Sequence, residues 1–346
     1  MQPATLPIGA PGPTLGGMWD ALPGLPEIPI VELAASDAAE LALHEADRAQ
    51  ALAAVAREIY PLWLLKLGDW RSRNWLLRQN NPYLGEIDRI AAAMRQPGVH
   101  MLNLSYEWAC TTGACDEGEG MRMLRVLDWP MPGLGRNLAV ARHRGPAGEW
   151  LNVTWPGFSG VLTGMAKGRF AAAFNQPPLR KRTPFFATDW IADRLAVGRS
   201  RNLPPAHLLR HVFDHCRDYE AAKAMLRDTP ICLPAFFVLS GTRPGEATVI
   251  ERLETAAHLH AAPAAVANHW LGMTLPGSPR GAYSQLRRKL MTDWLDRHAA
   301  PFDWLTPPIL NGDSRVAVET NAATGELRVI GFEPEGQATR PLHIAA

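Results

Sequence analysis

The sequence predicts an α+β fold in which antiparallel sheets are covered by helices. Strand-like segments come in groups separated by Gly and Pro turns, and helical patterns come in groups of their own. A parallel βαβ protein would instead alternate the two. Hydrophobic residues make up 47% of the 346 residues, which is enough to bury a large core. This length is typical of about two domains.

The N-terminal part is predicted to be mostly helical after a Pro- and Gly-rich arm over residues 1–30. A helical pattern begins at Ser36 or Asp37, either of which can cap it, and continues to about Leu67. Pro61 should end or kink this helix because proline lacks a backbone N–H. Further helices are expected over residues 70–79 and 82–94, with another beginning near residue 100.

Strand patterns dominate the rest of the chain, interrupted by two helical segments over 203–227 and 284–298. The last two strands form a hairpin-like pair. The predicted strands cover residues 123–128, 138–142, 150–154, 160–163, 170–174, 236–240, 247–252, 266–268, 316–319 and 327–332.

Charge and composition exclude several classes of protein. The chain has 35 basic and 34 acidic residues, so its net charge of +1 offers no surface for nucleic acid. No apolar run is long enough for a transmembrane helix. Residues 1–17 lack the basic and apolar regions of a secretory signal, so a cytoplasmic location is expected. The four cysteines match neither a disulfide framework nor a paired zinc site, and no metal or cofactor is expected.

Cys110 is the candidate nucleophile because of the residues around it. Arg125-Val126-Leu127-Asp128 begins fifteen residues after it. A thiol with an ordinary pKa of about 8.5 needs a base or a nearby cation to become nucleophilic. If the chain were cut before Cys110, the new α-amine, with a pKa near ~8, would be a base on the same residue. Small Ala109 would let the thiol reach its carbonyl, Arg125 would stabilise the thiolate, and Asp128 would hold the new ammonium.

Ordered motifs on both sides of Cys110 resemble the N-terminal-nucleophile (Ntn) hydrolases of the acid ceramidase, N-acylethanolamine acid amidase and choloylglycine hydrolase family. The resemblance covers about residues 80 to 290, and only the ordered set of motifs is specific. The motifs lie at residues 81–87 and 102–107 before Cys110, and at 155–165, 174–175, 237–252 and 266–270 after it, followed by Arg280.

This resemblance implies a four-layer αββα sandwich. Residues 1–109 would be a mostly helical pro-segment that stays bound after self-cleavage, and residues 110–346 the catalytic part. Cys110 would attack a linear amide of a small N-acyl compound with a lipophilic acyl group. Asn175 and Asn268 would stabilise the oxyanion, while Arg125, Asp128 and Arg280 would align the reacting groups.

The sequence departs from the family pattern at two points, and one assignment stays open. Val126 stands where the family has Asn, and Gln176 stands where some members have Glu. Arg287 is an alternative to Arg280.

Two other functions stay open. Cys-Thr-Thr-x-x-Cys at residues 110–115 is also similar to isopenicillin N acyltransferases, which would pass the acyl group to an amine. A non-catalytic scaffold with the same fold is the third interpretation. The Cys110–Cys115 spacing could suggest a metal or redox pair, but no second pair supports it. The oligomeric state is open.

Overall fold

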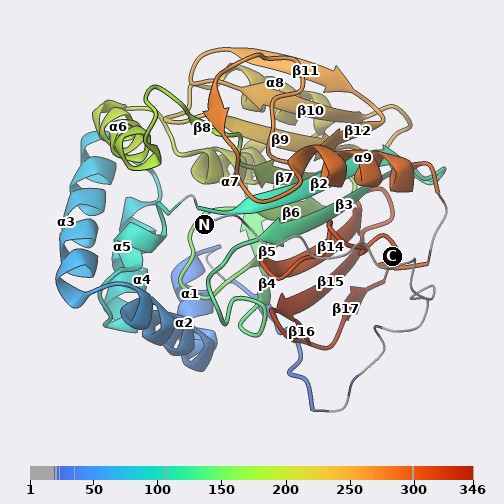
Figure 1. Cartoon of the computed structure of the whole chain (residues 1–346). Coiled ribbons are helices and arrows are strands. Elements are labelled where there is room, and N and C mark those ends of the chain that lie inside the picture. The colour runs from blue at the N-terminus through green and yellow to red at the C-terminus, as the bar shows by residue number, and fades with distance from the viewer. Residues whose placement is uncertain are drawn as a thin grey trace.

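The computed structural model describes residues 24–345 apart from 35, 106, 298 and 299, together with residues 19 and 22. It is a mixed α+β fold of two large sheets and surrounding helices (Figure 1). Most of the predicted arm over residues 1–30, and Tyr106 of the motif before Cys110, lie outside the described residues.

The first sheet has eight strands, and all neighbours in it are antiparallel except β1 and β4. Their order across the sheet is β1 (Ile30–Glu32), β4 (Ala139–Gly145), β5 (Gly148–Thr154), β6 (Thr163–Ala166), β7 (Phe170–Asn175), β9 (Ala235–Ser240), β10 (Ala247–Arg252) and β11 (Ala257–Ala261).

The second sheet has seven strands and carries Cys110. It runs from β12 (Ala264–Val266) through β2 (Ala109–Asp116), β3 (Met121–Asp128), β14 (Ser314–Asn321) and β15 (Glu326–Glu333) to β16 (Gly336–Gln337), with β17 (Leu342–Ile344) also beside β15. A separate small sheet pairs β8 (Leu179–Arg180) with β13 (Gly277–Ser278).

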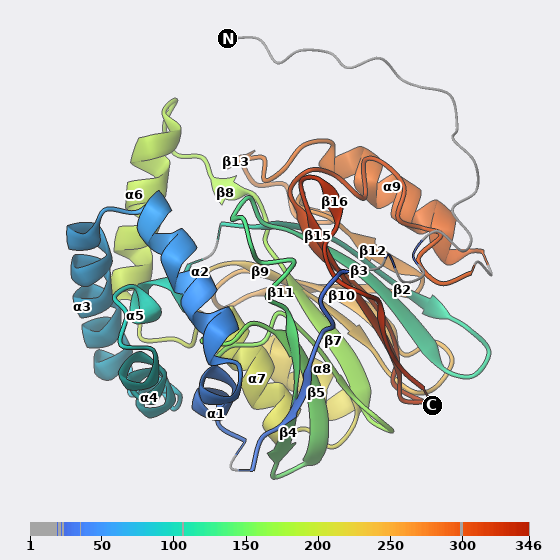
Figure 2. The same cartoon turned by 90° about the horizontal axis from the view of Figure 1, so that it is seen from below.

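The two large sheets face each other, with β2 and β3 in contact with β7 and β9. Helices α7 (Pro205–His215) and α8 (Tyr219–Asp228) cover the outer face of the first sheet, and α9 (Ser284–Leu295) covers the outer face of the second (Figure 2). The strands between these layers are almost wholly buried, as expected for sheets covered on both faces. The layers therefore follow the order helix, sheet, sheet, helix.

The remaining helices gather at one end of the sheets, as both views show. They are α1 (Ala38–His44), α2 (Ala46–Ile59), α3 (Leu62–Arg78), α4 (Leu84–Met94), α5 (Val99–Leu102) and α6 (Phe186–Arg199). Because β1 precedes them and pairs with β4, the N-terminal part shares a sheet with the rest of the chain. None of the described helices is long and apolar enough to cross a membrane.

Several predicted elements have different limits in the structure. Asp37 caps α1 as expected, but Glu45 separates α1 from α2, and the segment over 70–79 belongs to α3. The segment over 203–227 is two helices, because Asp218 caps a new one by accepting a hydrogen bond from Ala221 N. Strand β2, which carries Cys110, was not predicted, and neither were helix α6 and strand β11.

The predicted strand over 160–163 is wrong except for its last residue, where β6 begins. The backbone N–H of Val161 donates to the carbonyl of Ala206 at 3.0 Å. The segment is therefore tied to the start of α7 at Val161, and it meets β7 only where the Leu162 carbonyl accepts a hydrogen bond from Phe174 N at 2.9 Å.

Candidate active site

Cys110 is the second residue of β2, and its side chain faces the space between the two sheets. Side chains alternate along a strand, so Thr112 shares this face, while Gly113 and Cys115 face α9. Gly113 lies against Met291 of α9, and Cys115 belongs to the apolar cluster beneath that helix. The two cysteines thus point to opposite faces of the sheet, and both are free thiols.

Arg125 reaches the sulfur of Cys110 from the adjacent strand β3. It lies opposite Thr112 in the sheet and is fully buried. Its Nη2 donates to Cys110 Sγ at 3.2 Å, and its Nη1 donates to Asn175 Oδ1 at 2.9 Å and to the carbonyl of Phe174 at 3.1 Å. Thr112 Oγ1 donates to the same Asn175 oxygen at 2.8 Å. Asn175, at the end of β7, therefore orients the guanidinium of Arg125 toward the thiol.

The backbone of Cys110 is held by two other buried side chains. Asn268 Oδ1 accepts a hydrogen bond from Cys110 N at 3.0 Å and another from Arg287 Nη2 at 2.9 Å. Arg287 Nη1 donates to the Cys110 carbonyl and to Thr111 Oγ1, both at 2.7 Å. Arg287 extends inward from α9 and is only 1% exposed.

Asp128 lies opposite Ala109, the residue before the candidate nucleophile, in the pairing of β2 with β3. Its Oδ1 accepts a hydrogen bond from Ser314 Oγ at 2.7 Å, and its Oδ2 lies 3.4 Å from Arg287 Nη1. Burial raises the pKa of this carboxyl group, while the charge of Arg287 and the hydrogen bond from Ser314 oppose the rise. The site thus places a carboxyl group beside the Ala109–Cys110 bond.

The thiol of Cys110 is protonated at neutral pH in the uncleaved chain. Burial raises its pKa to about 11, and the charge of Asp128 adds to the rise. The positive charges of Arg125 and Arg287 oppose it. A further change, such as the release of the Cys110 α-amine by cleavage of the chain, is needed before this sulfur becomes a strong nucleophile.

Arg280 lies at the edge of the site, next to Gly281, and binds other groups. Its Nε donates to the carbonyl of Pro177 at 3.0 Å, and its Nη1 lies 3.4 Å from Glu107 Oε2. Glu107 also binds Arg194 at 2.7 Å. The structure therefore brings five of the six predicted site residues together at Cys110. The sixth, Arg280, does not join them, and Arg287 is the arginine that contacts the Cys110 carbonyl beside Arg125 at the sulfur. The five are Cys110, Arg125, Asp128, Asn175 and Asn268.

The amide nitrogens of the two asparagines point away from the thiol in the uncleaved chain. Asn268 Nδ2 donates to the carbonyl of Gln176 at 2.7 Å, and Asn175 Nδ2 lies 3.4 Å from the carbonyl of Val266. The side-chain oxygens of both asparagines face hydrogen-bond donors. These donors assign which end of each amide group is the oxygen and which is the nitrogen. The two asparagines here orient Arg125 and the Cys110 backbone.

Sequence reasoning missed Thr111, Thr112 and Ser314. The two threonines directly follow Cys110, and alternation along a strand would have placed them on opposite faces around it. Ser314 follows Asp128 by 186 residues, and no local pattern indicates that they meet.

An apolar cavity of about 80 Å³ lies close to the site. Trp108, two residues before Cys110, is buried and contacts Trp129 with ring centroids 5.0 Å apart. Trp129 also lines the cavity. Its other walls come from both the N-terminal helices and the later strands, and include Leu52, Met94, Leu102, Trp155 and Phe158.

Across the residues that the structure describes, no group of three or more His, Cys, Asp or Glu side chains is arranged to hold a metal ion.

The chain is a distant homologue of N-acylethanolamine-hydrolyzing acid amidases and acid ceramidases. It is 27% identical over 157 residues to the N-acylethanolamine-hydrolyzing acid amidase of Oryctolagus cuniculus, across 44% of this chain and 42% of that protein. It is 31% identical over 99 residues to the acid ceramidase of Pan troglodytes, across 29% of this chain and 24% of that protein. These matches span less than half the length of either relative. No protein-family model matches the chain.

Among solved structures, the chain is similar to the Caenorhabditis elegans ortholog of N-acylethanolamine-hydrolyzing acid amidase. The TM-score is 0.48 at 15% sequence identity, covering 62% of this chain and 92% of the other.

Proposed function

We propose that the protein is a self-cleaving cysteine hydrolase of linear amides. One observation carries this proposal. The amide nitrogen, the carbonyl oxygen and the sulfur of Cys110 are held by three different buried side chains, Asn268, Arg287 and Arg125. An ordinary core cysteine needs none of these polar contacts. Burying three such polar groups costs free energy that their hydrogen bonds only offset, and arrangements of this kind are typical of functional sites.

The first reaction is cleavage of the chain before Cys110. The sulfur attacks the Ala109 carbonyl, the C–N bond breaks, and the thiol proton passes to the leaving nitrogen. That nitrogen becomes the α-amine of Cys110 and already hydrogen-bonds Asn268 Oδ1. Water then hydrolyses the thioester, giving a carboxylate on Ala109 and a free thiol on Cys110. In this step Asp128, opposite Ala109, would accept hydrogen bonds from the departing amine.

The second reaction uses the new N-terminus. The α-amine has a pKa close to neutral pH and takes the thiol proton as the sulfur attacks a substrate amide. It then gives the proton to the leaving amine, and water releases the acid from the thioester. Arg125 stays beside the sulfur, and we propose that Asn175 and Asn268 turn their amide nitrogens to the oxyanion once residues 107–109 are free to move.

The substrate is an N-acyl compound with a lipophilic acyl group. The apolar cavity beside Trp129 supports this proposal, since that ring contacts Trp108 on the acyl side of the bond that is cut first. The name of one relative agrees with an N-acyl substrate, because it describes an amidase that hydrolyses N-acylethanolamine. Residues 1–109 would remain bound as a mostly helical subunit of the four-layer enzyme.

Intact-mass measurement of the purified protein tests the proposal. Two fragments that meet between Ala109 and Cys110 are expected from the wild type, and one uncleaved chain without turnover from Cys110→Ala. Product analysis with and without an acceptor amine separates hydrolysis from acyl transfer. A Cys110→Ala protein that still hydrolyses amides would refute the proposal, and an uncleaved wild type with an inert thiol would favour the scaffold.

A further inference from the structure

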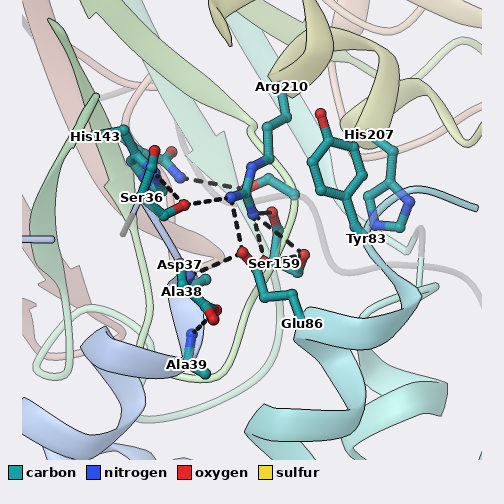
Figure 3. A network of polar contacts seen from close by, with 12 residues as sticks. Ser36, Asp37, Ala38, Ala39, Tyr83, Glu86, His143, Ser159, His207 and Arg210 are labelled. Atoms are coloured by element: carbon teal, nitrogen blue, oxygen red, sulfur yellow. Dashed lines mark hydrogen bonds and ion pairs between the residues drawn. The ribbon is translucent and has the colours of Figure 1, made fainter. Parts of the chain in front are cut away.

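A second buried polar cluster, away from Cys110, joins the N-terminal helices to α7. At its centre, Glu86 of α4 forms an ion pair with Arg210 of α7 (Figure 3). The two side chains are only 7% and 4% exposed. Glu86 precedes the proposed cleavage point and Arg210 follows it, so the ion pair links the two fragments.

The carboxylate of Glu86 and the two Nη atoms of Arg210 are hydrogen-bonded by backbone and side chains from both sides of the junction, while Arg210 Nε lies 3.8 Å from Asp214 Oδ2. Arg210 Nη1 binds Glu86 Oε1 and the Ser159 carbonyl, the latter at 2.6 Å. Arg210 Nη2 binds Glu86 Oε2 and the Ser36 carbonyl, each at 2.8 Å. Glu86 also accepts hydrogen bonds from Ser159 Oγ at 2.5 Å and from Ala38 N at 3.0 Å.

Further contacts extend this cluster along the same boundary. Arg210 lies over the ring of Tyr83, 4.6 Å from its centre, and His207 contacts Asn81 at 3.0 Å. Ser159 N donates to Asn103 Oδ1 at 2.7 Å. Because Asn103 lies only six residues before Ala109, the cluster also fixes the chain just ahead of the proposed cleavage point.

We propose that the Glu86–Arg210 cluster is the clamp that keeps the N-terminal fragment on the catalytic fragment after self-cleavage. This inference rests on the proposed function. Once the Ala109–Cys110 bond is cut, only noncovalent contacts hold residues up to 109 in place. Loss of the N-terminal fragment would break the hydrogen bonds of Arg210 with Glu86 and with the Ser36 carbonyl, leaving Asp214 Oδ2, 3.8 Å from Arg210 Nε, as a carboxylate partner within its own fragment. The N-terminal fragment is therefore a permanent subunit whose partner is residues 110–346 of the same chain.

The first experiment compares Glu86→Gln with Glu32→Gln in the self-cleaving chain. Glu32 also forms an ion pair across the junction, with Arg142 at 2.6 Å, but its side chain is 66% exposed. After mass spectrometry has shown cleavage, fragment association is measured by size-exclusion chromatography over a dilution series. Glu86→Gln is expected to weaken association at least about 100-fold, whereas Glu32→Gln changes it less than about fivefold.

Arg210→Lys tests the same ion pair in case the Glu86→Gln variant fails to fold. It keeps the positive charge but loses the forked geometry, so an intermediate weakening is expected. The double variant Glu86→Gln/Arg210→Gln should lose no more than the worse single variant, because each single change already breaks the same pair.

The second experiment does not depend on cleavage. In the uncleaved Cys110→Ala chain, Glu86→Gln should speed amide hydrogen exchange in α1, α4 and α7 at least about tenfold, while Glu32→Gln should not. A wild type that is never cleaved would refute the hydrolase and, with it, the need for a clamp. Cleaved fragments that stay together as tightly with Glu86→Gln as with Glu32→Gln would overturn the clamp and leave the hydrolase standing.

Discussion

Asn268 Oδ1 binds the backbone nitrogen of Cys110 at 3.0 Å and, on its other side, the guanidinium of Arg287 at 2.9 Å. The oxygen therefore connects the nitrogen that would leave during self-cleavage to the arginine that holds the carbonyl of the same residue. It can make this contact because Asn268 follows the end of β12, which pairs with β2.

Asn268→Ala is expected to slow self-cleavage about 100-fold, because the nitrogen of Cys110 and Arg287 both lose their shared acceptor. The rate is followed by intact mass during expression or refolding. Asn202→Ala is the control, since Asn202 contacts only the carbonyl of Ile231 at 3.4 Å and the nearby turn. Normal cleavage of Asn268→Ala would show that this contact is structural only.

Arg287 and Arg280 provide a matched pair of variants. Arg287→Ala is expected to slow self-cleavage and turnover by about 100- to 1000-fold, because it removes the donor to the Cys110 carbonyl and the ion-pair partner of Asp128. Arg280→Ala should cost less than about tenfold, since Arg280 binds Glu107 and the carbonyl of Pro177, whereas Arg287 binds the Cys110 carbonyl.

Circular dichroism must accompany both measurements, because Arg287 is buried. Arg287→Lys should keep the fold and recover only part of the rate, since lysine cannot reproduce the fork that binds Cys110, Thr111 and Asn268. If Arg280→Ala lost activity while Arg287→Ala kept it, the role of aligning the reacting groups would belong to Arg280.

A glycine at position 281 lets the chain pass close to the site. Gly281 has φ +65°, and a Cβ there would lie 2.8 Å from Ala109 Cβ and 3.0 Å from Arg287 Nη2. Gly281→Ala is therefore expected to displace one of these groups, slow self-cleavage at least about tenfold and lower the free energy of unfolding by about 1–2 kcal/mol.

The control for this change is Gly198→Ala in helix α6, where nothing lies within 4 Å of the added Cβ. That variant should gain up to about 1 kcal/mol of stability and cleave normally. Urea denaturation of both changes in the Cys110→Ala background gives the stabilities, and intact mass in the Cys110 chain gives the rates. Equal cleavage by the two variants would contradict the role assigned to Gly281.

The core of the candidate site could be predicted because it depends on a hairpin. Cys110 and Arg125 lie on the consecutive strands β2 and β3, joined by residues 117–120, so their separation along the chain determines their pairing even though β2 itself was not predicted. The choice between Arg280 and Arg287 depended on a different kind of information. Spacing after Asn268 favoured Arg280, but the chain between them has little regular structure, so spacing does not determine position there.

The helical pattern contained a better signal for Arg287. Arg287, Met291 and Leu295 recur every four residues, and the structure buries all three on the face of α9 that covers the sheet. A charged residue on the buried face of an amphipathic helix indicates a buried partner. The ion pair of Glu86 with Arg210 had no such signal, because the residues lie on separate helices 124 positions apart.

Two buried histidines predict how the stability of the uncleaved chain depends on pH. Burial and the charge of Arg210 lower the pKa of both His143 and His207 to about 3, with a hydrogen bond to the Ser36 backbone opposing the change at His143. In the unfolded chain each would have a pKa of about 6.5. Between these pH values the unfolded chain binds more protons than the folded chain. The stability gained from keeping the two histidines neutral in the fold is therefore fully present above about pH 6.5 and is lost as the pH falls toward 3.

The free energy of unfolding of Cys110→Ala should therefore fall on acidification by up to about 1.4 kcal/mol per pH unit for each histidine. His143→Phe keeps a ring to stack on Trp150 but cannot titrate, so its urea midpoint should change less between pH 7 and pH 4. His343→Gln, on the half-exposed last strand, is the control and should keep the parental slope.

Since His143 and His207 contact Ser36 and Asn81 across the fragment boundary, acid should also loosen the N-terminal fragment after cleavage. A stability that is flat over this range would mean that these side chains take up protons in the folded state.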